Sequence, residues 1–213
     1  MEDIPSGQEA LADLSGAIAT IWSALDSAIL ETKEFFEERG APIDRSLAPN
    51  LIRYVVKRRL NAQGQIAEDE ESLDYEMQTL PNNGLCMEYG RYQLRILKAD
   101  NGELPIPGQS KKRQAFWNQA QLDLYDNEQP AQAVPSVNLI VLWDADSNYN
   151  FDSVSLICPK TGGMTRDSVS NYWSVPVPNP IMQLASAIAS EVEEDDIVIT
   201  PLQEMTGETG NAE

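Results

Sequence analysis

The sequence predicts an α+β protein in which two hairpin or meander units form an antiparallel sheet, packed with helices and preceded by a long N-terminal amphipathic helix. Apolar side chains recur at three- and four-residue steps over residues 8–39, as they do in an amphipathic helix. Residues 75–98 and 137–159 carry alternating or continuous apolar patterns interrupted by turn signals, which is typical of strands. The strands come in runs between helices, without the regular alternation that builds a parallel sheet.

The first helix is expected from about Gln8 to Arg39, with a glycine and a proline just beyond it as stop signals. Its 3-4-3-4 spacing is that of a coiled coil or of a helix lying in a groove. Two interpretations stay open: a helix facing the protein's own core, and an interface with a partner or a second copy. The stripe consists of Leu11, Leu14, Ile18, Ile21, Trp22, Leu25 and Phe35.

Two shorter helices are expected to be basic, one at 51–60 and one at 111–117. Positive charges at the start of a helix oppose its dipole, so those of the second helix do not serve helix stability. The cations could contact phosphate, pair with the acidic run at 67–76, or remain in solvent. They are Arg53, Lys57, Arg58 and Arg59 in the first helix, and Lys111, Lys112 and Arg113 in the second.

The strand patterns fix several further expectations. A hairpin turning at residues 90–91 places Glu88 opposite position 93 and away from Lys98, so the carboxylate–lysine arrangement of restriction-type nucleases is not formed. The apolar run at 137–146 predicts a central strand, and the proline-rich stretch after residue 170 predicts an edge strand. We expect three regions: the helix at 1–40, an α+β domain at 41–195, and an acidic, partly disordered extension at 196–213.

The net charge of −19 is concentrated at the two ends of the chain. Residues 1–40 hold nine acidic and two basic side chains, and residues 181–213 hold eight acidic and no basic ones. Such a field repels nucleic acid and anionic membranes at long range, and it favours a partner with a basic surface. Solubility alone is the other explanation for the acidic ends.

The chain contains no histidine, so it lacks the commonest general base and metal ligand. The residues Cys86 and Cys158 lie in apolar strand-like runs, which favours buried free thiols in a reducing compartment over a disulfide. No signal peptide or apolar run long enough for a membrane span is recognised, so a cytoplasmic location is expected. No nucleotide-binding glycine motif is found, and no cofactor is expected.

Three aspartates at the end of the central strand are the remaining candidates for chemistry. Asp144 and Asp146 form a D-x-D, and Asp152 lies across the expected turn. Carboxylates in this arrangement can hold Mg²⁺ or Mn²⁺. A solvated turn rich in Asp and Asn is the interpretation that the sequence favours.

The leading hypothesis is a non-enzymatic, acidic interaction or regulatory protein of an antitoxin-like, phage-defence accessory or nucleic-acid-mimic type. It would self-associate as a homo-oligomer, or bind a protein with a basic surface in a hetero-complex, through the 8–39 helix. The first alternative is a nucleic-acid-binding protein that uses the two basic helices. The second alternative is a divalent-metal hydrolase that uses the three aspartates.

Overall fold

The computed structural model describes residues 4–66, 75–80, 84–119 and 137–180 of the 213-residue chain. The predicted α+β class is confirmed, because N-terminal helices are followed by a six-stranded, mostly antiparallel mixed sheet that packs against helices. The described residues up to Pro178 form one compact unit. The extension expected at 196–213 lies outside the described residues.

The predicted N-terminal helix is two helices, α1 (Gly7–Asp13) and α2 (Ser15–Glu37), which meet at Leu14. Ser6 begins α1 with a capping box, since its side chain accepts from the Glu9 amide while the Glu9 carboxylate accepts from the Ser6 amide. Leu14 ends the first helix and begins the second with φ −99° and ψ 6°. The apolar stripe continues through this break, which is why the spacing alone did not reveal it.

The third helix, α3 (Ala48–Ile66), packs beside α2. The Asp44 carboxylate accepts hydrogen bonds from the backbone amides of Ser46 and Leu47, at 2.7 and 3.1 Å, just before this helix begins. Farther along, the Glu31 carboxylate of α2 pairs with both Arg58 and Arg59 of α3. Apolar packing and these ion pairs together join the two helices.

The sheet is ordered β1-β2-β3-β4-β5-β6, so every strand lies beside its neighbours in sequence. Four of the five pairs are antiparallel, as predicted, but β3 and β4 are parallel. A parallel pair requires a crossover connection, and the segment between β3 and β4 contains α4. The elements are β1 (Tyr75–Leu80), β2 (Gly84–Tyr89), β3 (Tyr92–Lys98), α4 (Lys111–Trp117), β4 (Val137–Ala145), β5 (Phe151–Thr161) and β6 (Ser170–Val177).

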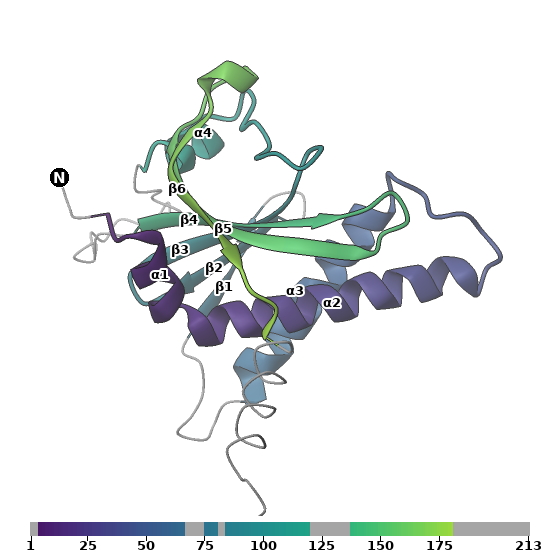
Figure 1. Cartoon of the computed structure of the whole chain (residues 1–213). Helices are drawn as coiled ribbons and strands as arrows, with labels where there is room; N and C mark the ends of the chain where they lie inside the picture. Colours follow the sequence, from purple (N-terminus) through teal and green to yellow (C-terminus); the bar gives the residue numbers. More distant parts are fainter. Residues whose placement is uncertain (1–3, 67–74, 81–83, 120–136, 181–213) are drawn as a thin grey trace, which may run out of the picture. The chain divides into compact units, whose positions relative to one another are not determined.

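Helices lie on both faces of this sheet, with α1, α2 and α3 on one side and α4 on the other (Figure 1). The larger core lies on the first face, where Leu94 and Ile96 of β3 pack with the side chains of α2 and α3. The second face has a smaller core around Phe116 and Trp117 of α4, with Ile140 of β4. Side chains alternate between these faces along each strand, as the pleat requires.

Three strand predictions are confirmed. The central position of β4 agrees with its nearly continuous burial, and β6 lies at an edge of the sheet. Glu88 pairs with Gln93 across the hairpin, as the turn at 90–91 requires. Gly90 has φ +54° there, a left-handed conformation that glycine adopts without strain.

Candidate functional site

A cavity of about 660 Å³ lies at the end of the sheet where β3 ends and β2 begins. Its volume is in the range of small-molecule sites, about 300–1,000 Å³. Side chains from both sheet faces line it, together with α3, α4 and the loop before α4. The apolar part of the wall includes Leu85, Ile96, Leu97, Ile106, Trp117 and Trp143.

The cavity lies at the carboxyl ends of the parallel strand pair. Leu97 and Lys98 end β3, and Trp143 lies beside Lys98 in the register of β4. In sheets with parallel strands, ligands bind outside the carboxyl ends, where the connections diverge and leave space. The β3–β4 crossover therefore creates this cavity, and an all-antiparallel sheet would not have positioned α4 above it.

Charge distinguishes this cavity from the rest of the acidic protein. Five cationic side chains line it, and none of the described residues in its wall is Asp or Glu. The ion pairs found in the described segments use other arginines. Four of the five cations, namely Arg95, Lys98, Lys112 and Arg113, have no carboxylate partner in those segments. The five are Arg53 from α3, Arg95 and Lys98 from β3, and Lys112 and Arg113 from α4.

Aromatic rings hold two of these cations in place of carboxylates. The Arg95 guanidinium lies 5.0 Å from the centre of the Phe116 ring. The Lys98 ammonium lies 5.7 Å from the ring centres of both Trp143 and Tyr149. A ring face attracts a cation without neutralising it, so both positive charges remain available to an anion.

Burial acts against the charge of Arg95. It lowers the pKa of the guanidinium from its usual value, and the nearby Arg113 charge lowers it further. Both effects disfavour the charged form, which arginine nevertheless keeps at any accessible pH. The site therefore holds a half-buried cation beside a second cation, an arrangement that a bound anion would stabilise.

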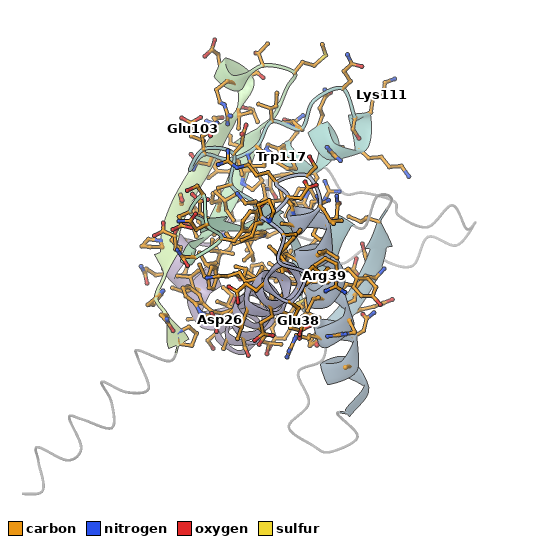
Figure 2. The ribbon with its side chains drawn as sticks, turned by 90° about the vertical axis from the view of Figure 1, so that its right-hand side faces the viewer. Asp26, Glu38, Arg39, Glu103, Lys111 and Trp117 are labelled. Atoms are coloured by element: carbon orange, nitrogen blue, oxygen red, sulfur yellow. The ribbon has the colours of Figure 1, made fainter. Side chains whose placement is uncertain are left out.

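The indole of Trp117 supplies an unpartnered hydrogen-bond donor in the cavity wall. Trp117 is 2% exposed, and its Nε1 has no acceptor among the described residues. Figure 2 shows Trp117 turned towards the body of the protein, whereas Lys111, at the other end of α4, points away from it. Gly162 leaves room for this indole, because a Cβ there would lie 2.4 Å from the Cβ of Trp117.

A cluster of hydrogen-bond acceptors lies beside the cavity on the second sheet face. The Oε1 atom of Glu88 accepts from the side-chain amides of Gln78 and Gln93. Cys86 lies between this cluster and the cations: burial raises the pKa of its thiol to about 12, while the Arg95 charge opposes that rise and the Glu88 charge adds to it. Burial likewise raises the pKa of the Cys158 thiol to about 12. Both cysteines are free, as predicted, and neither has the lowered pKa of a nucleophile.

The structure divides the seven predicted nucleic-acid-binding cations. Arg53, Lys112 and Arg113 come together in the cavity, although the first is far from the other two in sequence. Arg58 and Arg59 instead pair with Glu31 of α2. Lys57 and Lys111 are not among the cavity residues, and the exposed Lys111 begins α4.

The residues predicted to bind a partner lie largely in the core. Leu14, Ile18, Ile21, Trp22 and Leu25 are at most 7% exposed, and they pack against α3 and the sheet. Leu11 and Phe35 are half-buried at the margin of the same core. Partner binding or self-association through this stripe stays a prediction, and it would require the chain to expose side chains that it buries on itself.

The three aspartates do not converge in the part of the chain that the structure describes. Asp146 closes the β4–β5 turn by accepting from the backbone amides of Asn148 and Asn150, each at 2.8 Å. Asp144 accepts from the Ala145 amide, and Asp152 is exposed. Within the described segments, no group of three or more acidic, cysteine or histidine side chains could hold a metal ion. The metal-hydrolase hypothesis has no ligand arrangement to rest on there.

Sequence reasoning missed Arg95 and Lys98 as parts of a site. The two residues lie on opposite faces of β3, Arg95 beside Phe116 and Lys98 beside Trp143, and the sequence pattern suggested only a nuclease role for Lys98. Their proximity to Arg53 and Arg113 depends on the crossover, which the sequence did not indicate. One signal was present: Glu88 of β2 and Gln93 and Arg95 of β3 are long polar side chains on one face of the sheet.

Comparison with known proteins finds no match for the chain among family models, curated proteins or solved structures. No helix in the described segments is long and apolar enough to cross a membrane. The cytoplasmic location stays a prediction.

Proposed function

We propose that this protein binds a small anionic ligand in the cavity at the end of the sheet, without catalysing a reaction on it. The observation that carries the proposal is the lining of that cavity, in a chain of net charge −19: no described lining residue is Asp or Glu, and four of its cations, Arg95, Lys98, Lys112 and Arg113, have no carboxylate partner among the described residues. A strongly acidic protein has many carboxylates with which to neutralise a cationic site. A site left positive is therefore one where an external anion supplies the compensation.

The size and surroundings of the cavity favour a small ligand over a nucleic acid. A polyanion follows an extended basic surface and is repelled at long range by a strongly acidic protein. A small anion experiences mainly the nearby charges, because salt screens the distant ones beyond about 8–10 Å. The apolar wall around Leu97 and Ile106 suits a ligand with an uncharged body as well as its anionic group.

The chemistry of the lining supports binding over catalysis. The titratable groups among the described lining residues are the five cations and Cys86. The Cys86 thiol has a raised pKa, so it is a weak nucleophile, and no carboxylate in the described wall can act as a general base. Side chains of these kinds can position an anion and neutralise its charge.

Calorimetric titration with inorganic pyrophosphate at low ionic strength tests the proposal. We expect saturable binding that weakens as salt is added, together with a change in fluorescence, since Trp117 and Trp143 line the cavity. A double variant, Lys98→Gln/Arg113→Gln, should bind at least about 100-fold more weakly, because two charge-assisted contacts are lost.

The matched control is Arg58→Gln/Arg59→Gln, which makes the same change in net charge outside the cavity. It should leave the affinity for pyrophosphate within about threefold of the wild-type value, since only distant charges change. Absence of binding by the wild-type protein at millimolar pyrophosphate, or equal losses in the two double variants, would contradict the proposal.

A further inference from the structure

The cations that line the cavity divide between the two faces of the sheet. Lys98 ends β3 with its ammonium 5.7 Å from the ring centre of Trp143, which belongs to the larger core on the first face. Arg95 lies three residues earlier on the same strand, with its guanidinium 5.0 Å from the centre of the Phe116 ring in the smaller core on the second face. Side chains an odd number of residues apart on a strand point to opposite faces, so these two charges lie on opposite sides of the sheet.

Each charge has further cations on its own face. Helix α4 supplies Lys112 and Arg113 on the second face, and α3 supplies Arg53 on the first. Figure 1 shows α3 and α4 on opposite sides of the sheet. The cavity therefore has two cationic ends: the second-face cations Arg95, Lys112 and Arg113, and the first-face cations Arg53 and Lys98.

The wall between the two cationic ends is apolar. Strands β1, β2 and β3 contribute Leu80, Leu85 and Leu97 to it, at the end of the sheet that separates the two faces. The loop before α4 adds Ile106, which is 39% exposed. An uncharged, apolar segment of a ligand can pack against these side chains, whereas a charged segment would lose hydration there.

Distance prevents one compact anion from reaching both cationic ends. The backbone positions of Arg95 and Lys98 are about 10 Å apart, at about 3.3 Å per residue, and their side chains leave opposite faces of the sheet. The two phosphates of pyrophosphate share an oxygen atom, so they stay together at one end. An extended chain gains about 1.1–1.2 Å per bond, as a polypeptide does over its three backbone bonds per residue, so about nine bonds are needed to span the cavity.

We propose that the ligand is an elongated molecule with an anionic group, a phosphate or a carboxylate, at each end and an uncharged, mainly apolar middle. One anionic group binds the second-face cations, and the other binds the first-face cations. The three second-face cations attract an anion more strongly than the first-face cations do, so a ligand with a single anionic group occupies the second face first. This inference rests on the anion-binding function proposed above, and it adds the number and the spacing of the anionic groups.

Calorimetric titration of the full-length protein with three phosphonates tests the two-ended site. Octane-1,8-bisphosphonate has nine bonds between its phosphorus atoms. Octylphosphonate has the same apolar chain with one anionic end, and propane-1,3-bisphosphonate has two anionic ends on a chain too short to span the cavity. We expect one molecule of octane-1,8-bisphosphonate to bind per protein, at least about tenfold more tightly than either other phosphonate, because its second contact is intramolecular.

The variant Lys98→Gln removes a first-face cation. It should reduce the advantage of octane-1,8-bisphosphonate over octylphosphonate to less than about threefold, whereas Arg113→Gln should weaken the binding of both ligands. If Lys98→Gln unfolds, Lys98→Met serves in its place, since it keeps an apolar stem against Trp143. The matched control is Lys160→Gln: Lys160 also lies over an aromatic ring, 5.5 Å from the centre of Tyr172, but it is not a cavity residue, so the advantage should persist.

The outcomes separate this inference from the anion-binding function. Equal affinities for octane-1,8-bisphosphonate and octylphosphonate, in a protein that binds pyrophosphate, overturn the two-ended site and leave the anion-binding function standing. Equal affinities for the two bisphosphonates do the same, because charge without spacing then accounts for binding. An advantage that persists in Lys98→Gln or Lys98→Met also overturns the two-ended site. Failure of all three phosphonates and of pyrophosphate to bind overturns both proposals.

Discussion

Replacing Arg95 with methionine is expected to make the protein more stable and the cavity a weaker binder of anions. Arg95 is half-buried, has no carboxylate partner among the described residues, and lies near the charge of Arg113. Methionine is apolar and flexible, so it can occupy the same space beside the Phe116 ring. The two expected effects have opposite signs, as they do at residues kept for function at the expense of stability.

The size of the stability gain follows from three contributions. Leaving a buried polar group unpaired costs about 1–3 kcal/mol, and more if it is charged, but a half-buried side chain that keeps contact with solvent costs about as much as the lower end of this range. Loss of the contact with Phe116 removes about 0.5–1 kcal/mol of stabilisation. The apolar methionine side chain gains about 0.8 kcal/mol for each additional methylene that it buries. The net expectation is a gain of roughly 1 kcal/mol, which raises Tm by about 2–4 °C in a chain of this size.

Thermal unfolding with and without pyrophosphate, at constant ionic strength, measures both effects. Pyrophosphate should raise the Tm of the wild-type protein, because a ligand that binds the folded state stabilises it. It should have much less effect on Arg95→Met. Arg58→Met is the control: Arg58 is paired with Glu31 at 2.8 Å, so its loss should slightly lower Tm and leave the response to pyrophosphate intact.

Either of two results would refute this reasoning. A drop of several degrees in the Tm of ligand-free Arg95→Met would mean that the guanidinium stabilises the fold and has partners beyond those described. An undiminished rise in Tm with pyrophosphate would mean that Arg95 takes no part in binding.

Four other predictions follow from the packing and the titration of particular side chains. Gly162→Ala should destabilise the protein by about 1–3 kcal/mol and weaken pyrophosphate binding, because its Cβ would lie 2.4 Å from Trp117; urea unfolding at wild-type stability would contradict the close contact. Leu25→Ala should lower the free energy of unfolding in urea by about 3 kcal/mol, because the side chain is buried in the core. Unchanged stability together with a changed molar mass in light scattering would instead favour the interpretation of the stripe as an interface. The two buried cysteines should resist iodoacetamide at pH 8 until the protein unfolds, since both thiols have a pKa of about 12, and rapid alkylation of the native protein would count against their burial. Hydrogen bonds from Asn150 lower the pKa of Asp146, so the stability that Asp146 contributes is present above about pH 4 and is lost as the pH falls through its folded-state pKa. Asp146→Asn should therefore lower the free energy of unfolding at pH 7 and lower it less at pH 3. A difference between variant and wild type that does not depend on pH would contradict this.

Local patterns were sufficient to predict the fold class. The stripe from Leu11 to Phe35 predicted helix because its spacing matches 3.6 residues per turn, and the continuous apolar run of β4 predicted a strand covered on both faces. The break at Leu14 could not be predicted in this way, since the residue is apolar and the stripe continues through it. Whether the stripe faces a core or a partner was equally undecided, because both require the same side chains.

The site was harder to predict because it depends on long-range topology. Arg53 and Arg113 are 60 positions apart and line one cavity only because β3 and β4 are parallel and α4 crosses between them. Two hairpins in sequence favoured an antiparallel sheet throughout, which would place α4 elsewhere. The cations that the sequence singled out on α3 were divided by another contact between distant residues, the pairing of Glu31 with Arg58 and Arg59.

Crystals of the protein soaked in sodium tungstate test the central claim most directly, because the anomalous signal of tungsten locates a bound oxyanion without any assumption about the natural ligand. The anion-binding account predicts a strong peak in the cavity, within hydrogen-bonding distance of Arg95 and of at least one of Lys98 and Arg113. Tungstate bound only at exposed arginines such as Arg58, with the cavity empty, would contradict it.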